Sequence, residues 1–304
     1  MPTSAHCTRR HILYALATVL VAFPYGAMLL AGDDSVAVHR RDVSNDRPFQ
    51  PFVFVQAGDP QMGFGPSLDH DREMFIKLGK RAKELDAAFV LVCGDLVHKG
   101  SKADWEAFDA ALATFDLPTP IVPGNHDLAN MQSLTRFRSN YGPDHYRFTY
   151  NNCTFIGLNT MTLFAAATDA KDDPKSAAAW QQQGRKQWQW LEDVLAEAKK
   201  AGRTHVFLFM HHPPFAQKED ERDSYHAWPA KQRKRVCKLI RDYGIRVVFH
   251  GHTHKTYELQ PDDEAFTLFS LAGTAKAFDK NGFALRLVSV DEDGLKTRPI
   301  RLDQ

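Results

Sequence analysis

Apolar stretches alternate with amphipathic segments along most of the chain. Residues 52–57, FVFVQA, are rich in β-branched and aromatic side chains and predict a buried strand. Residues 69–86 place apolar side chains on one helical face, and residues 87–95, AAFVLVCGD, form a continuous apolar run typical of a strand buried on both faces. This alternation continues to about residue 251 and predicts a mostly parallel sheet with crossover helices.

The remaining segments extend this prediction. Ser101 is expected to cap a helix, with Asp104 three residues further on, and PTPIVPGNHD contains a third strand. Further strands and helices are predicted at 146–150, 153–159, 184–201, 205–210, 230–243 and 246–251. The Ala-, Asp- and Gln-rich residues 161–182 are expected to form a long loop, either a lid or a substrate-side insertion. Short strands without an intervening helix follow residue 257 and predict a second, more antiparallel sheet.

The first residues have the composition of an export signal. Arg9 and Arg10 precede an apolar stretch at 12–23, and small residues lie near Ala31. The paired arginines also fit a twin-arginine signal, and an uncleaved segment would instead anchor the chain in a membrane. We expect a signal or anchor at 1–31, a polar linker at 32–48 and one domain at 49–304, located outside the cytoplasm.

Composition sets wide limits on function. The 304 residues are 43% hydrophobic, enough for a core of ordinary size. Lys and Arg number 38 and Asp and Glu number 37, so the net charge of +1 gives no reason to expect a nucleic-acid partner. The four cysteines have no zinc-site spacing, and Cys93 and Cys153 lie in apolar runs where a core role is expected.

Polar residues stand directly after several predicted strands. Each of these motifs has a plain explanation when taken alone, as a turn, a helix cap or a surface histidine. The carboxyl ends of parallel strands meet at one edge of a sheet, so the residues are expected to converge. They are Asp59, Asp95, Asn125, His211 and His252.

Their chemistry is that of a divalent metal site. Carboxylate, imidazole and amide groups all bind such cations, and His252 and His254 are two residues apart in an extended turn. Two cations about 3.5–4 Å apart need a bridging carboxylate, for which Asp95 is the natural candidate. Such a site carries excess positive charge, and phosphate is the anion that it would attract.

The ordered motifs AGDPQMG, VLVCGDLVH, GNHD, HHP and VVFHGHTH resemble the calcineurin-like metallophosphoesterases from about residue 52 to 302. The resemblance is greatest to a vertebrate Ser/Thr phosphatase subgroup that also has Gln in the first motif. It implies an α/β fold, a four-layer α-β-β-α sandwich with two mixed sheets. It also implies hydrolysis of phosphate esters by a hydroxide that two metals activate.

The resemblance further implies the role of each site residue. One metal would be held by Asp59, Gln61, Asp95 and His254, and the second by Asp95, Asn125, His211 and His252. His126 would face the substrate as a catalytic residue, and Asp127 behind it would orient its ring. The family's ligand stands two residues before the proline, which selects His211 over His212.

Two interpretations remain for Gln61. As a ligand it offers a neutral amide oxygen, which favours manganese or magnesium at the first site, with iron and zinc as the other candidates. Alternatively, its amide stabilises the turn after the strand and binds no metal.

The expected substrate is a phosphorylated small molecule or phosphoprotein, and a phosphomonoesterase is the first hypothesis. A phosphodiesterase or nucleotide pyrophosphatase is the alternative within enzymes, because the same site serves both kinds of ester. The hypothesis from another class is an exported binding protein that has lost the chemistry. A membrane is a partner only if the N-terminal segment is uncleaved.

Overall fold

The computed structural model describes residues 43–165, 174–280 and 282–302, besides Met1. The helices and strands of the described residues all lie within the unit Ser35–Gln304. The expected export signal therefore lies outside the described residues. Within the described part of the chain, no helix has both the length and the apolar character needed to cross a membrane.

The first sheet places the N-terminal strand beside the last strands of the chain. Its order is β11-β10-β1-β2-β3, and β1 pairs with β2 in parallel and with β10 antiparallel. The register sets Val55 opposite both Val90 and Leu287. The strands are β1 (Phe52–Ala57), β2 (Val90–Cys93), β3 (Ile121–Val122), β10 (Ala284–Val290) and β11 (Leu295–Arg301).

The second sheet is also mixed. Its order is β4-β5-β6-β7-β9-β8, with parallel pairing from β5 through β9 and antiparallel pairing at both edges. The strands are β4 (Tyr146–Tyr150), β5 (Cys153–Leu158), β6 (His205–Met210), β7 (Val247–His250), β8 (Tyr257–Leu259) and β9 (Thr267–Ser270).

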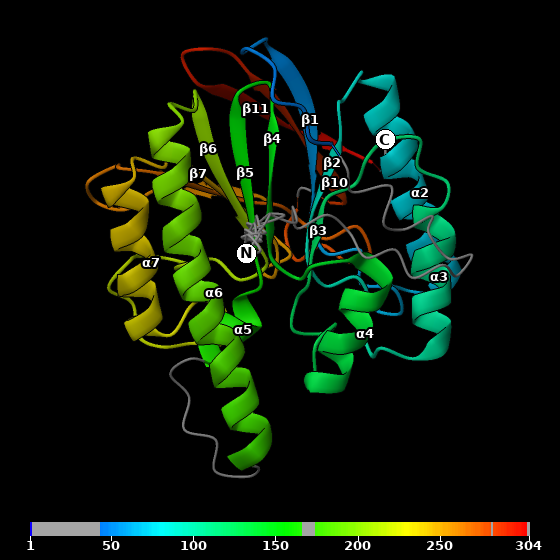
Figure 1. Cartoon of the computed structure of the whole chain (residues 1–304). Helices are drawn as coiled ribbons and strands as arrows, with labels where there is room; N and C mark the ends of the chain where they lie inside the picture. Colours follow the sequence, from blue (N-terminus) through cyan, green and yellow to red (C-terminus); the bar gives the residue numbers. More distant parts are fainter. Residues whose placement is uncertain (2–42, 166–173, 281, 303–304) are drawn as a thin grey trace. The chain divides into compact units, whose positions relative to one another are not determined.

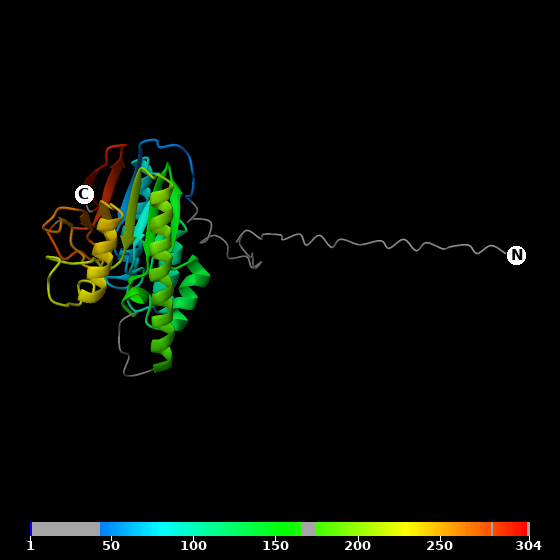
Figure 2. The same ribbon diagram turned by 60° about the vertical axis from the view of Figure 1, so that its left-hand side comes forward.

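Helices cover the outer faces of both sheets (Figure 1). On the first sheet lie α2 (Leu68–Glu84), α3 (Lys102–Leu112) and α4 (Met131–Tyr141). On the second lie α5 (Thr160–Ala165), α6 (Pro174–Lys200) and α7 (Ala230–Asp242), and Figure 2 shows α6 in front of the sheet that it covers. The predicted four-layer α-β-β-α sandwich with two mixed sheets is confirmed.

Three hydrophobic cores explain why the central strands are apolar on both faces. Along β6, Phe207 and Phe209 point into the core between the sheets, whereas Leu208 and Met210 face α6 and α7. Successive side chains of a strand point to opposite faces, so a strand between two cores needs apolar residues at every position. Cys93 and Cys153 are free and buried in the core between the sheets, as predicted.

Two predictions about the elements are wrong. The expected loop at 161–182 contains part of α5, and α6 begins at Pro174 rather than near Gly184. The strands after residue 257 form no sheet of their own, because β8 and β9 extend the second sheet while β10 and β11 extend the first. The alternating part of the chain is itself divided between the two sheets.

The end of the expected linker at 32–48 packs against the domain. The last residues of the expected linker lie on the domain, since Val43 is buried and the Asn45 amide donates to the carbonyl of Thr149 at 2.8 Å.

The predicted cap of α3 is confirmed, because Ser101 and Asp104 form a reciprocal capping box.

Candidate metal centre

The turns after the strands have an unusual backbone. Gln61, Asp95, His252 and His254 all have positive φ, at 35°, 47°, 68° and 53°. Residues other than glycine rarely adopt this conformation, and when they do it is often at a functional site held by its surroundings. The four side chains are therefore aimed by a backbone that the tertiary structure imposes.

Glycines before these residues keep space free for the site. A Cβ on Gly94 would lie 2.7 Å from Nδ1 of His211, and Gly94 itself has φ of 88°. A Cβ on Gly251 would lie 2.8 Å from a carboxylate oxygen of Asp59. The motifs GD and GHTH thus need glycine because a side chain from a strand end of the other sheet occupies the position of its Cβ.

His211 lies at the centre of one group of predicted ligands. Its Nδ1 is 2.9 Å from the carbonyl oxygen of Cys93, which can only accept, so Nδ1 carries a proton. Its Nε2 lies 3.2 Å from Asp95 Oδ2, 3.1 Å from Asn125 Oδ1 and 3.2 Å from His252 Nδ1. Acceptor atoms from four segments of the chain therefore converge on one point.

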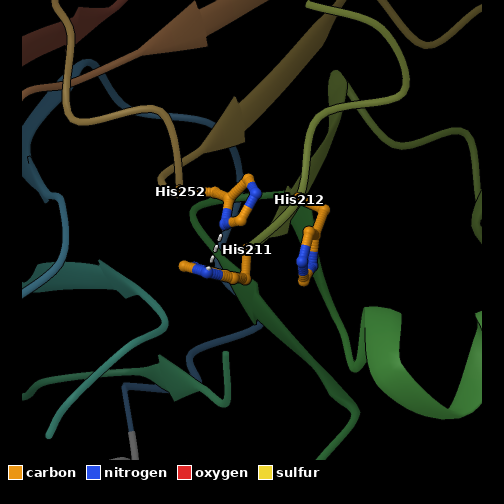
Figure 3. Close-up of side chains that lie close together, drawn as sticks. All are labelled: His211, His212 and His252. Atoms are coloured by element: carbon orange, nitrogen blue, oxygen red, sulfur yellow. Dashed lines mark hydrogen bonds between the residues drawn. The ribbon is translucent and has the colours of Figure 1, made fainter. Parts of the chain in front are cut away.

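His252 completes this group, as Figure 3 shows. Its Nε2 is 2.9 Å from the carbonyl oxygen of Tyr225, which leaves the lone pair of Nδ1 directed at His211. The neighbouring His212 lies to the side and bonds through Nδ1 to the hydroxyl of Thr160 at 2.7 Å. Of the two adjacent histidines, it is His211 that faces Asp95 and Asn125.

The electrostatics favour positive charge at this point. Burial alone would lower the pKa of His211, but the charge of Asp95 and its hydrogen bond, with a contribution from Asp59, raise it to about 9. Burial, with the charge of His211, lowers the pKa of His252 to about 3. A cation bound among these atoms would replace the proton on Nε2 of His211, while Nδ1 keeps its proton.

A second group lies next to the first. Asp59 is buried and accepts the amide of His252 through both carboxylate oxygens at 3.0 Å, and Asp59, Asp95 and His211 can together hold a metal ion. Nδ1 of His254 lies 2.6 Å from the carbonyl oxygen of Lys276, so its Nε2 keeps a lone pair. Gln61, Asp95, His252 and His254 line one cavity of about 400 Å³.

The donor atoms fit divalent cations. Oε1 of Gln61 is buried and has no hydrogen-bond partner among the described residues, while its Nε2 lies 3.4 Å from Nδ1 of His98. A buried polar atom without a partner is costly unless something absent from the protein chain binds it. This orphaned oxygen is what the metal interpretation of Gln61 requires.

The structure corrects the role assigned to Asp127. Its carboxylate accepts the backbone amides of Leu96, Val97 and Gly124 at 2.9, 3.2 and 2.8 Å, which joins the turns after β2 and β3. The ring of His126 is held instead by the carbonyl oxygen of His98, 2.6 Å from Nδ1. The hydrogen bonds given for the Asp127 carboxylate are therefore to backbone amides and not to the imidazole of His126.

The sequence did not reveal Tyr225 as part of the site. Its hydroxyl accepts the Asn125 amide at 3.0 Å, and its carbonyl accepts from His252, so it orients two predicted ligands. Tyr225 lies in an irregular segment with no motif around it. The acidic stretch before it holds that segment in place, since Glu219 pairs with Arg241 and Glu221 accepts the amides of Ala216 and Gln217.

An α-β-β-α sandwich with carboxylates, amides and imidazoles gathered at its strand ends defines a metal-dependent phosphoesterase. The model of the calcineurin-like phosphoesterase family matches residues 52–256, and the chain belongs to this family. The resemblance seen in the motifs is confirmed, and the chain is an enzyme of the phosphatase type.

Two relatives and one solved structure are consistent with this family. Serine/threonine-protein phosphatase CPPED1 of Bos taurus is 27% identical over 278 residues, covering 84% of this chain and 85% of the relative. CPPED1 of Danio rerio is 26% identical over 307 residues, covering 90% and 95%. The crystal structure of a dimetal phosphatase from Danio rerio shares the fold, with a TM-score of 0.61 and 16% identity over 82% of this chain and 99% of that chain.

Proposed function

We propose that this protein hydrolyses phosphate monoesters, phosphoproteins among them, at a centre of two divalent cations. Asp59, Gln61, Asp95 and His254 would hold one cation, and Asp95, Asn125, His211 and His252 the other. The observation that carries this proposal is the convergence of Asp95, Asn125 and His252 on Nε2 of His211. The relatives named as serine/threonine phosphatases support a monoester substrate.

The cations, when bound, supply the positive charge that holds phosphate oxygens and activates the attacking water. The chain's own residues orient the ligands and handle the leaving group. Carbonyl oxygens of Cys93, Tyr225 and Lys276 fix the tautomers of the three histidines. Nε2 of His126 is free to face the substrate, because its Nδ1 is bonded to the His98 carbonyl, and there it would donate a proton or a hydrogen bond.

We further propose that manganese or magnesium, rather than zinc, occupies the Gln61 position. A neutral amide oxygen is a harder and weaker ligand than the imidazole found there in most of the family. We also propose that residues 1–31 direct export, on the strength of the paired arginines and the apolar stretch that follows them.

Asp95→Asn tests the centre. The carboxylate contacts the His126 amide through Oδ1 and His211 through Oδ2, so the amide variant loses the charge that both groups use. We expect bound metal to fall and turnover to drop by more than about 100-fold, because charge at the reacting centre is lost. Metal content, together with rates on an aryl monoester, a bis-aryl diester and a phosphopeptide, measures this.

One control variant and two contrary outcomes complete this test. Asp116→Asn, at an exposed aspartate away from the cavity, should change neither metal content nor rate. An Asp95→Asn protein that keeps two metals and near-normal turnover would remove Asp95 from the centre. A higher kcat/KM for the diester than for both monoesters would replace the monoester proposal by a diesterase.

A further inference from the structure

Two exposed aromatic side chains stand at the mouth of the metal cavity. Among the described residues, apart from Met1, the exposed large hydrophobic side chains are Tyr225 at 65% and Phe278 at 51%. Both line the cavity that Gln61, Asp95 and His254 also line. Exposed apolar side chains that gather at one place indicate a binding surface rather than chance.

Both rings are held against predicted metal ligands. The Tyr225 ring lies 4.8 Å from the ring of His252, and its hydroxyl accepts the amide of Asn125. The Phe278 ring lies 4.9 Å from that of His254, whose carbonyl accepts the Phe278 amide at 2.8 Å. The aromatic surface therefore begins directly at the predicted ligands.

A series of ring contacts links the rim of the cavity to His126. Phe64 packs edge-on against Phe278 at 6.1 Å and stacks on His98 at 4.5 Å, and His98 stacks on His126 at 4.9 Å. Of these rings, Phe64 and Phe278 line the cavity and offer a flat group both face and edge contacts. The series of contacts ends at His126, which also lines the cavity and which the proposed function places beside the leaving group.

The charge of the rim also restricts the ligand. Lys255 lines the cavity, and the ammonium of Lys276 lies 4.9 Å from the centre of the Phe64 ring. Among the described lining residues the only carboxylate is Asp95, a predicted metal ligand. A cationic group attached to the phosphate would meet no carboxylate among these lining residues except Asp95, whereas an anionic aromatic group would be attracted by the two lysines.

We infer that the preferred substrate is an aryl phosphate monoester, in which the aromatic ring is bonded directly to the ester oxygen, as in a phosphotyrosyl side chain. This inference rests on the proposed monoesterase function and specifies its substrate class. The bond from phosphorus to the aryl oxygen breaks, and a new bond forms from phosphorus to the oxygen of a water molecule. One proton of that water ends on the departing phenol oxygen, and inorganic phosphate is released.

Binding of two phosphonates separates ring recognition from leaving-group reactivity, because their phosphorus–carbon bond is not hydrolysed. Phenylphosphonate and methylphosphonate are compared as inhibitors of the full chain, loaded with manganese and hydrolysing an alkyl monoester. We expect the phenyl compound to bind about tenfold more tightly, the effect of one to two aromatic contacts. Phe278→Ala should reduce this ratio to about threefold or less, and Phe278→Tyr, which keeps the ring, should preserve it.

The ratio is internal to each variant, so a general loss of stability or metal affects both inhibitors alike. A ratio near one in the parent, or an unchanged ratio in Phe278→Ala, would overturn the inference while leaving the monoesterase proposal intact. If no monoester is hydrolysed, the proposed function fails instead, and calorimetric titration with the same two phosphonates still decides whether the rim selects an aromatic ring.

Discussion

At the scale of one residue, the surroundings of the Gln61 side chain distinguish between a metal ligand and a residue that stabilises a turn. A residue that stabilises a turn uses its amide oxygen to accept a backbone amide within that turn. Here the oxygen is buried without a partner in the described part of the chain, and the amide nitrogen lies 3.4 Å from Nδ1 of His98. This arrangement supports the ligand interpretation, because it leaves the oxygen for a cation.

Substitution at Gln61 tests that role. Gln61→His should tighten the first metal and shift the preference of the enzyme toward zinc or iron, because imidazole is a softer donor than an amide. Gln61→Ala should lower the affinity for that metal by about 10- to 100-fold, the loss typical when a group that supports a metal is removed. Metal titrations of both variants with manganese and zinc measure the effect. Identical metal content and preference in all three proteins would make Gln61 a turn residue.

At the scale of elements, Asp144 connects segments from both helical layers. Its carboxylate accepts from Nε of Arg138 in α4 at 2.6 Å and from Nδ2 of Asn159, after β5, at 2.7 Å. Asn159 in turn accepts from Gln187 of α6 at 3.0 Å. One buried carboxylate therefore holds the end of α4, the turn before β4 and the segment that leads into α5.

Asp144 also makes stability depend on pH. Burial alone would raise its pKa, but the hydrogen bonds and charges of His145 and Arg138 hold the pKa of Asp144 well below its usual range. Its contribution is therefore present above about pH 4, the ordinary pKa of an aspartate, and is lost as the pH falls toward the depressed value.

Asp144→Asn should lower the free energy of unfolding by about 2 kcal/mol at pH 7, the typical result of removing a charged partner from a buried hydrogen-bonded group. The difference from the parent should shrink as the pH falls below about 4. Urea unfolding at pH 7 and pH 3 measures both values. Exposed Asp116→Asn serves as the control, and a difference that is the same at both pH values would contradict this account.

The prediction of a loop at 161–182 was wrong because the packing of neighbouring elements extends a helix into this segment. Residues 174–182, PKSAAAWQQ, contain the good helix formers Ala, Gln and Lys, but the Ala-, Asp- and Gln-rich composition gave no clear apolar face. In the structure the first turns of α6 continue a helix whose later residues, Trp188 and Leu191, are buried against the second sheet. Packing of those later turns extends the helix beyond what local periodicity indicates.

At the scale of the whole molecule, the proposed export depends on residues 1–31. If Arg9 and Arg10 form a twin-arginine signal, replacing both with Lys should abolish export by that route, because the charge is kept and only the arginine pair is lost. A general secretory signal should tolerate the same change. Fractionation of the host cells with an activity assay measures the outcome. Unchanged export would favour the general route, and activity that stays with the membrane would favour an anchor.

The sequence by itself determined which of the predicted metal ligands stand at strand ends. Asp59, Asp95, His211 and His252 each follow a strand of four to six residues with a local apolar pattern, and Asn125 follows the short apolar pair Ile121–Val122. The direction of a parallel strand decides at which edge its last residue lies, so the pattern places these side chains together before any contact is known. The same local information located Ser101 and Asp104 at the start of α3.

Only the tertiary structure decided how the strands divide between two sheets and how the site is oriented. The pairing of β1 with β10 joins residues more than two hundred positions apart, and no local periodicity encodes it. The left-handed backbone at Asp95 and His252, the three backbone amides around Asp127 and the position of Tyr225 likewise depend on contacts between separate turns. Such contacts form only when the strand ends converge, because each turn is held by groups that another turn supplies.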